Sequence, residues 1–175
     1  MNITPLYILS QIFIILNYVF LVITYQLKKK DKILFVNNCA QLSAGLSYLC
    51  LGAYTGLAMT IISIIRNTAF IVNEKKNNKS DILTLLVIYA LMIILAVFTY
   101  NGFLSLMSVF ATMLATFALW QKSTKVYKIL GVPVSLLWIT YNIYIKSIFG
   151  IILECILMTS AVIGFIREKV YKQKN

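Results

Sequence analysis

The sequence predicts an all-α membrane protein with seven transmembrane helices. With 61% hydrophobic and 12% charged residues, the chain has too little polar surface to cover a water-soluble domain. It contains seven apolar stretches, and a helix that rises about 1.5 Å per residue crosses a hydrocarbon core of about 30 Å with roughly 17 to 25 residues. Clusters of Lys and Arg follow the first, third, fifth and seventh of these stretches. We expect residues 1–175 to form one integral membrane domain, with no room for a separate soluble catalytic unit.

Short connections join the expected spans. The first span is not preceded by the basic segment that begins a signal peptide, so we expect it to be retained as a helix. Gly52 and Gly56 bracket a tight turn, and Asn101-Gly102 is a strong turn dipeptide. The expected spans are residues 6–26, 33–53, 56–74, 82–100, 102–120, 129–145 and 148–166.

The basic residues predict the orientation of the chain. Lys and Arg collect on the cytoplasmic side of membrane proteins, and with seven spans all of the clusters fall on one side. The N-terminus is then outside and the C-terminus cytoplasmic. A nucleic-acid surface does not fit, because it needs basic residues gathered on one face with stacking aromatics. Only Arg66 and Lys146 lie outside the four clusters, which are Lys28, Lys29, Lys30 and Lys32; Lys75, Lys76 and Lys79; Lys122, Lys125 and Lys128; and Arg167, Lys169, Lys172 and Lys174.

The two halves of the chain resemble each other. Tyr25-Gln26 precedes a basic cluster, an apolar span, a turn that ends at Gly56 and a further span; Trp120-Gln121 begins the same order, with the turn ending at Gly150. The two halves are 95 residues apart at the first point and 94 at the second. Three spans, a linker span and three more spans give both triplets the same orientation, as a parallel repeat about the membrane normal. The expected parts are a three-helix bundle at 6–74, a linker helix at 82–100, a second bundle at 102–166 and a cytoplasmic tail at 167–175.

Polar residues recur at helical spacing along five spans, whereas the linker span is almost wholly apolar. Such one-sided stripes are typical of helices that turn a polar face toward the protein interior. Small residues also let helices approach closely, so packing alone is an alternative explanation for the Gly, Ser and Thr positions. The stripes are Ser10, Asn17 and Thr24; Asn37, Gln41 and Tyr48; Gly56, Thr60, Ser63 and Asn67; Ser105, Ser108, Thr112 and Thr116; and Ser135, Trp138 and Asn142.

Several segments resemble the YgjV-like bacterial inner-membrane proteins. They are Cys39-Ala-Gln-Leu-Ser-Ala-Gly-Leu-Ser-Tyr-Leu-Cys-Leu-Gly-Ala-Tyr-Thr-Gly56, Ile61-Ile-Ser-Ile-Ile-Arg-Asn67, Trp120-Gln-Lys-Ser123, Pro133-Val-Ser-Leu-Leu-Trp-Ile-Thr-Tyr-Asn142, and Ser147 with the Gly150 turn. The resemblance covers roughly residues 8 to 167 and implies a location in the bacterial inner membrane. It also implies kinship with the heptahelical PQ-loop and SWEET-like transporters, and hence a substrate path between two three-helix bundles.

One departure from the PQ-loop pattern concerns the hinge. The sixth span has Pro133-Val134 where the second has Cys39-Ala40. Pro133 is therefore a candidate hinge in one half only, which argues against symmetric rocking of the two halves.

Two charged residues lie inside spans. Arg66 is ten residues beyond Gly56, about 15 Å along the helix and near the midplane, where an Arg costs about 2.5–3.5 kcal/mol on insertion scales. Glu154 is the only acid well inside a span. If the third and seventh helices face each other, the two residues form a structural ion pair. Alternatively, Arg66 binds an anion or carboxylate and Glu154 is a proton-coupling or gating group.

Aromatic and amide side chains supply the remaining candidate substrate-binding residues. Trp138 is deep enough in its span to stack on a ring-shaped ligand, with Asn142 and Asn67 as hydrogen-bonding groups; Asn17 and Gln41 are further candidates on the polar stripes. Aromatic residues near a membrane surface also act as simple interfacial anchors.

Enzyme chemistry is not expected. The chain has no histidine, and Cys39, Cys50 and Cys155 lack metal-ligand spacing, so we expect no catalytic residue, cofactor or metal. The expected function is transport or facilitated passage of a small polar solute. Its expected partners are the lipid bilayer and that solute, and nucleic acid is not expected. Whether the protein forms a homo-oligomer is left as an open alternative. The alternative is a non-transporting scaffold or partner protein.

Overall fold

A computed structural model describes residues 4–26, 30–75, 82–121 and 124–174. Within these residues the fold is all-helical, with seven α-helices and one short 3-10 helix and without a strand. The helices are α1 (Pro5–Gln26), α2 (Lys30–Cys50), α3 (Tyr54–Lys75), α4 (Ile82–Phe98), η1 (Phe103–Ser105), α5 (Leu106–Trp120), α6 (Thr124–Tyr144) and α7 (Ile148–Lys174). Each expected span corresponds to one α-helix.

The largest difference from the expected spans is at the C-terminus. Helix α7 continues to Lys174, whereas its apolar span was expected to end at residue 166. The added residues contain neither Gly nor Pro, so no residue in them breaks the helix. Among the described residues, three segments are long and apolar enough to cross a membrane by length and composition: Pro5–Ile23, Tyr54–Asn73 and Phe103–Trp120.

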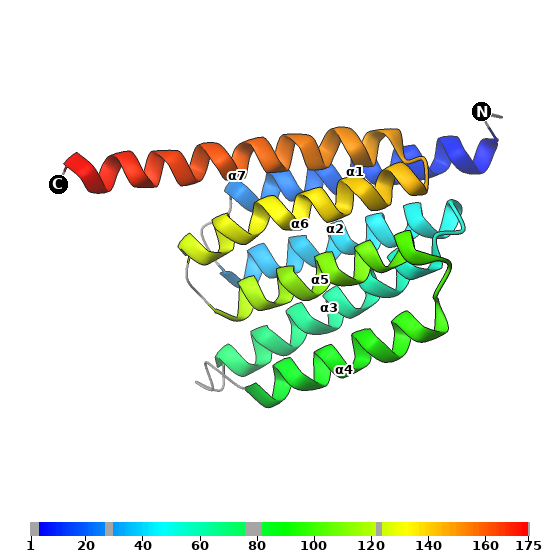
Figure 1. Ribbon diagram of the computed structural model, residues 1–175, viewed down its shortest axis with the longest axis horizontal. Coiled ribbons are helices and arrows are strands. Elements are labelled where there is room, and N and C mark those ends of the chain that lie inside the picture. The colour runs from blue at the N-terminus through cyan, green and yellow to red at the C-terminus, as the bar shows by residue number, and fades with distance from the viewer. Residues whose placement is uncertain (1–3, 27–29, 76–81, 122–123, 175) are drawn as a thin grey trace.

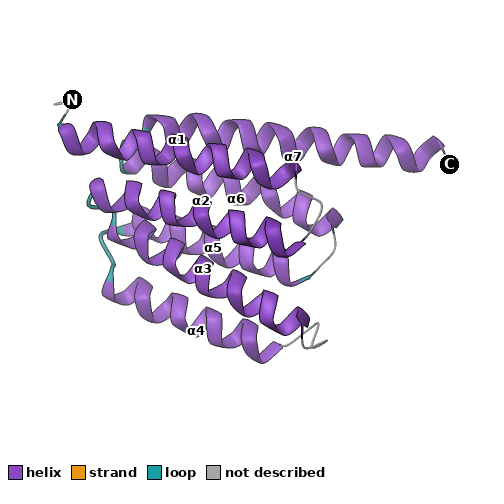
Figure 2. Ribbon diagram, turned by 180° about the vertical axis from the view of Figure 1, so that it is seen from behind, coloured by secondary structure: helices purple, strands orange, loops and turns teal. Residues whose placement is uncertain are grey.

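The helices lie alongside one another, with the two chain termini at opposite ends of the bundle (Figure 1). Helices α1, α3, α5 and α7 finish at one end, which we call the basic end because the four Lys and Arg clusters flank these helix ends in the sequence. The α2–α3, α4–α5 and α6–α7 connections lie at the other end, the turn end (Figure 2).

Six of the helices follow one another in a closed ring. Helix α1 packs on α2, α2 on α3, α3 on α5, α5 on α6, α6 on α7, and α7 again on α1. Helix α4 is outside this ring and packs on α3 and α5. Its buried face consists of Leu85, Ile88, Met92 and Ala96, while its other faces are exposed, as expected for a helix with lipid on one side.

The apolar core has two parts. One lies between α3, α4 and α5 around Met59, Ile62 and Met92. The other is inside the ring, where residues such as Tyr48 and Tyr141 pack together. Trp138 contacts both parts.

The sequence repeat recurs in the backbone of two turns. Gly52 has φ +67° and Lys146 has φ +58°, the left-handed conformation that closes a helix C-terminus. In each turn the next amide donates back to the helix end, from Ala53 to Tyr48 O at 2.8 Å and from Ser147 to Asn142 O at 2.9 Å. The two turns are therefore the same motif, 94 residues apart.

Substitutions at these two turns should change stability in opposite directions. Gly52→Ala places a side chain in the left-handed region and should destabilise the fold by about 1–2 kcal/mol. Lys146→Gly removes that strain, which outweighs the roughly 0.5–1 kcal/mol of extra chain entropy lost by glycine, so it should stabilise by about 0.5–1 kcal/mol. Thermal unfolding of the purified variants checks both signs. A loss of stability in Lys146→Gly would contradict the left-handed assignment.

Candidate functional site

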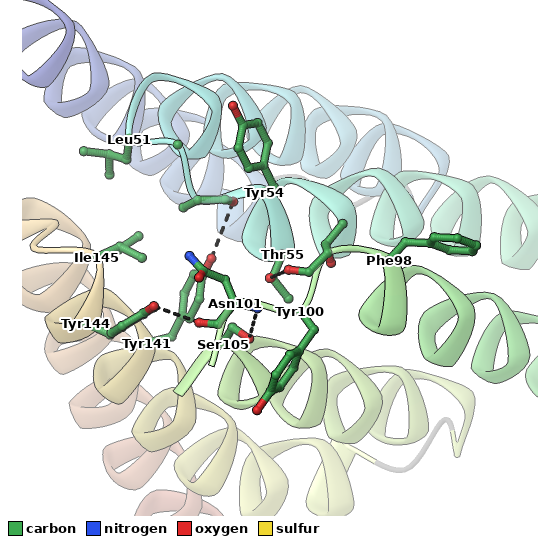
Figure 3. A pocket seen from close by; sticks show the side chains of 13 residues that line it. Leu51, Tyr54, Thr55, Phe98, Tyr100, Asn101, Ser105, Tyr141, Tyr144 and Ile145 are labelled. Carbon is green, nitrogen blue, oxygen red and sulfur yellow. Dashed lines mark hydrogen bonds between the residues drawn. The ribbon is translucent and has the colours of Figure 1, made fainter. Parts of the chain in front are cut away.

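A cavity of about 680 Å³ opens at the turn end, where parts of both halves of the chain meet (Figure 3). Its wall comes from the α2–α3 turn and the start of α3, from the α4–α5 connection with the end of η1, and from the end of α6. The thirteen lining residues are Leu51, Gly52, Ala53, Tyr54, Thr55, Phe98, Thr99, Tyr100, Asn101, Ser105, Tyr141, Tyr144 and Ile145.

The cavity wall is polar but carries no Asp, Glu, Lys or Arg. Hydroxyl groups, one carboxamide and main-chain carbonyls line it, between the rings of tyrosine and phenylalanine. Hydrogen bonds across the wall join the segments: the Thr55 hydroxyl donates to Thr99 O at 2.6 Å, and the Tyr144 hydroxyl to Asn101 O at 2.8 Å. The site therefore offers hydrogen bonds and ring faces to a ligand, and no formal charge.

Tyr141 ties the two halves together at the inner side of this cavity. The Gly56 amide, at the start of α3, donates to the Tyr141 hydroxyl at 2.8 Å. This bond satisfies one of the amides that a helix start leaves without an intrahelical partner. A β-carbon at position 56 would lie only 2.8 Å from the Tyr141 ring. Gly56 is thus required for the close approach of Tyr141.

Two more aromatic rings pack against Tyr141. Tyr48 and Trp138 are stacked, with ring centroids 5.9 Å apart and planes 8° from parallel. Tyr141 meets both of them edge-on at 5.8 Å. We call Tyr48, Trp138 and Tyr141 the aromatic cluster. It joins α2 of the first half to α6 of the second, next to the cavity.

A second polar centre lies further toward the basic end. Arg66 is buried, about 18 Å along α3 from its start. Its Nε and Nη2 donate to Asn67 Oδ1 at 3.2 and 3.0 Å, and its Nη1 donates to the Thr116 hydroxyl at 3.0 Å. Asn67 Nδ2 in turn donates to Asn37 Oδ1 at 2.8 Å and Asn38 Oδ1 at 3.1 Å. These five residues, the Arg66 cluster, join α2, α3 and α5.

The polar stripe of α5 connects the cavity with the Arg66 cluster. Ser105 lines the cavity, Thr116 accepts from Arg66, and Ser108 and Thr112 lie between them, all buried. The hydroxyls of Ser108, Thr112 and Thr116 donate to carbonyls of their own helix or its first turn, at 2.7 to 2.9 Å. The stripe spans about 16 Å.

The other predicted site residues are distributed around the ring. Asn17 is buried and donates to Ala40 O at 2.7 Å, which joins α1 to α2. Gln41 is partly buried on α2. Asn142 is buried beside Gly150, and its Oδ1 has no hydrogen-bond partner among the described residues. Pro133 lies inside α6.

Arg66 and Glu154 are not brought onto facing helices. Helix α3 packs on α2, α4 and α5, whereas α7 packs on α1 and α6. Glu154 lies instead near Ser135, whose hydroxyl bonds to its carboxyl group. The condition on which the expected ion pair depended is therefore not met.

The sequence did not reveal the cavity or the contact between Gly56 and Tyr141. Arg66, Asn67 and Trp138 are predicted substrate-binding residues, but none of them lines this cavity. The partners of the Gly56–Tyr141 bond are 85 residues apart, and no local pattern reports such a contact. The only available signal was the glycine at the start of the third span.

Apolar helices with buried polar groups between them and exposed apolar side chains outside define a helical membrane protein that crosses the bilayer more than once. The family model described as "Imp-YgjV: Bacterial inner membrane protein" matches residues 8–172, so the chain belongs to this family of bacterial inner-membrane proteins. Comparison with curated proteins and with solved structures found no match.

Arg66→Lys should destabilise the protein although it keeps the charge. One ammonium group cannot reproduce the guanidinium geometry that reaches both Asn67 and Thr116. A buried hydrogen-bonding group left unsatisfied costs about 1–3 kcal/mol. Thermal unfolding in detergent measures the loss, and Lys146→Ala, at an exposed cation, is the control with little expected change. Equal stability of Arg66→Lys and the native protein would show that the geometry of the Arg66 cluster is unimportant.

Proposed function

We propose that the protein is a transporter or facilitator that passes a small polar, uncharged solute across the bacterial inner membrane. The observation that carries this proposal is the cavity at the turn end, which is bounded by segments of both halves. Its wall of hydroxyls, carbonyls and aromatic rings suits a neutral solute that forms hydrogen bonds, because a charged solute would meet no opposite charge there.

The mechanism we infer is alternating access between two parallel three-helix bundles, α1–α3 and α5–α7, with α4 as the linker. The repeated turns at Gly52 and Lys146 support this division, as does the position of α4 outside the ring. The bond between Gly56 and Tyr141 crosses from one bundle to the other, so movement of the bundles apart would break it. Pro133 lies on the same helix as Tyr141, about 12 Å away, and is the candidate hinge.

The direction follows from the positive-inside rule. With the basic end in the cytoplasm, the N-terminus is outside and the cavity opens toward the outside. The aromatic cluster then lies between the outer cavity and the α5 stripe that leads to the Arg66 cluster. In this arrangement the solute passes from neutral groups to a cationic centre near the cytoplasmic half.

The alternative function is a scaffold without transport. Close helix approach favours it: a β-carbon on Gly45 would lie 2.9 Å from the Thr60 hydroxyl, so this glycine serves packing between α2 and α3. The hydroxyls of α5 also bond to their own helix, as packing residues do. In a scaffold the cavity has no ligand.

Binding of a solute should raise the thermal stability of the purified protein. We expect this for a neutral member of a panel of sugars, nucleosides, vitamins and organic anions, because a ligand at 100 times its Kd stabilises the folded state by about 2.7 kcal/mol. Proteoliposomes with the native protein should then swell faster in that solute than those with Tyr141→Phe, which lacks the hydroxyl bonded to Gly56.

The matched control is Thr140→Ala, at an exposed position next to Tyr141. It should behave like the native protein in both assays. Stabilisation by organic anions alone would indicate that the ligand binds at Arg66 and not in the neutral cavity. The absence of any stabilising solute, together with equal swelling of all variants, would favour the scaffold.

Labelling of single cysteines should confirm the orientation. In a background with Cys39, Cys50 and Cys155 replaced by Ala, Asn101→Cys at the exposed wall of the cavity should react with an impermeant maleimide added to intact spheroplasts. Gln121→Cys, exposed at the basic end, should react only after the membrane is permeabilised. The reverse pattern would place the cavity on the cytoplasmic side.

A further inference from the structure

Glu154 is an acidic residue in an apolar part of the chain. It lies within the apolar stretch Ile148–Thr159 of α7, whereas the other four acids, Asp31, Glu74, Asp81 and Glu168, stand beside basic clusters in the sequence. Acidic side chains inside a membrane span are costly and commonly mark proton or ion pathways. The neighbours of Glu154 decide which role the structure supports.

Side chains with hydroxyl groups from three helices lie near Glu154. Ser135 of α6 bonds to the carboxyl group, and Tyr18 of α1 and Tyr48 of α2 are close enough to interact with its charge. Cys155, the next residue on α7, is also close enough to Tyr18 to interact with it. Helices α1 and α6, which pack directly on α7, thus present hydroxyls to this carboxyl group.

These hydroxyls suit a carboxyl group that exchanges a proton. A hydroxyl donates to an ionised carboxylate and accepts from a protonated one, so the same neighbours satisfy both states. The Tyr18 hydroxyl is buried without a hydrogen-bond partner among the described residues. It can therefore donate to a nearby acceptor without losing an existing hydrogen bond.

The site is also connected with the aromatic cluster. Tyr48 stacks on Trp138 and meets Tyr141 edge-on, and Tyr141 holds the Gly56 amide of the other half. A shift of the Tyr48 ring would therefore act on Tyr141 and on its contact with Gly56. Tyr48 is therefore close to Glu154 and is also part of the aromatic cluster at the inner side of the cavity.

We propose that Glu154 is a proton-binding site that couples proton movement to solute transport through the aromatic cluster. Binding forms an O–H bond on the carboxylate, and release returns the proton to water on the opposite side after the closure has changed. The proton-binding site stands on its own contacts, whereas the coupling rests on the proposed transport function.

Trp138 supplies a direct optical probe of this site. The chain has two tryptophans, and the Trp120 indole nitrogen has no hydrogen-bond partner among the described residues, so Trp120→Phe removes it without loss of a bond. The fluorescence of the remaining Trp138 should change reversibly in a titration of the detergent-purified variant. Adding Glu154→Gln should abolish the change, Glu154→Asp should retain it with a shifted midpoint, and Glu168→Gln should leave it unaltered.

Infrared difference spectra provide a second measurement. The carbonyl band of a protonated carboxyl group should disappear over the same titration, and Glu154→Gln should lack this band. A fluorescence transition and a carboxyl band that both persist in Glu154→Gln would overturn the proton-binding site, as would their absence from the native protein. Reduced folding of Glu154→Gln does not obscure the result, because Glu154→Asp preserves the carboxyl group and reports the same transition.

Failure of the coupling can be told apart from failure of transport. Proteoliposomes that contain an internal pH dye are mixed with a solute identified by thermal shift. Coupling is supported if the solute acidifies the interior of vesicles that contain the native protein but not of vesicles that contain Glu154→Gln. Swelling without a pH change leaves transport intact and overturns the coupling. The absence of both swelling and a pH change overturns the transport function. The fluorescence titration still tests the proton-binding site in that case.

Discussion

The structure depends on one constraint: inside a bilayer, each main-chain amide and carbonyl must find its partner within the protein. The constraint explains why the described chain is helical, and it extends to the connections. The helix-ending turns at Gly52 and Lys146 each return an amide to a carbonyl of the preceding helix. At the start of α3 the Tyr141 hydroxyl accepts from Gly56. A requirement of the backbone has thus produced a contact that links the two halves.

Properties that depend on neighbouring residues in the chain could be predicted from the sequence. Span length follows from local apolarity, and the turn at Asn101-Gly102 follows from local backbone preference, so the helices lie where they were expected. The position of Arg66 on its helix was also predictable. Its partner Thr116 and the cavity were not, because they depend on which helices become neighbours. The ring places α5 against α3, and no residue spacing within either helix specifies that choice.

The two charged centres occupy different parts of the ring. Arg66 lies among α2, α3 and α5, whereas Glu154 lies on α7 next to α6 and α1. Arg66 is bonded to neutral polar groups, and Tyr48 of the aromatic cluster lies near Glu154. Arg66 therefore lies beside the polar stripe of α5, whereas Glu154 lies near the aromatic cluster, and the role of each stays a prediction.

The repeat preserves the backbone of the turns at Gly52 and Lys146 but not the side chains around them. At the separation of 94 residues, Tyr141 corresponds to Ser47. Tyr141 reaches the start of α3, whereas the Ser47 hydroxyl is buried without a hydrogen-bond partner among the described residues. Gly150, the counterpart of Gly56, is instead approached by Asn142 and Ser147 from its own half. The Tyr141 contact between the halves therefore has no repeat-related equivalent at Ser47. Any separation of the two halves would therefore break the contact between Gly56 and Tyr141, whereas the neighbours of Gly150 lie within its own half.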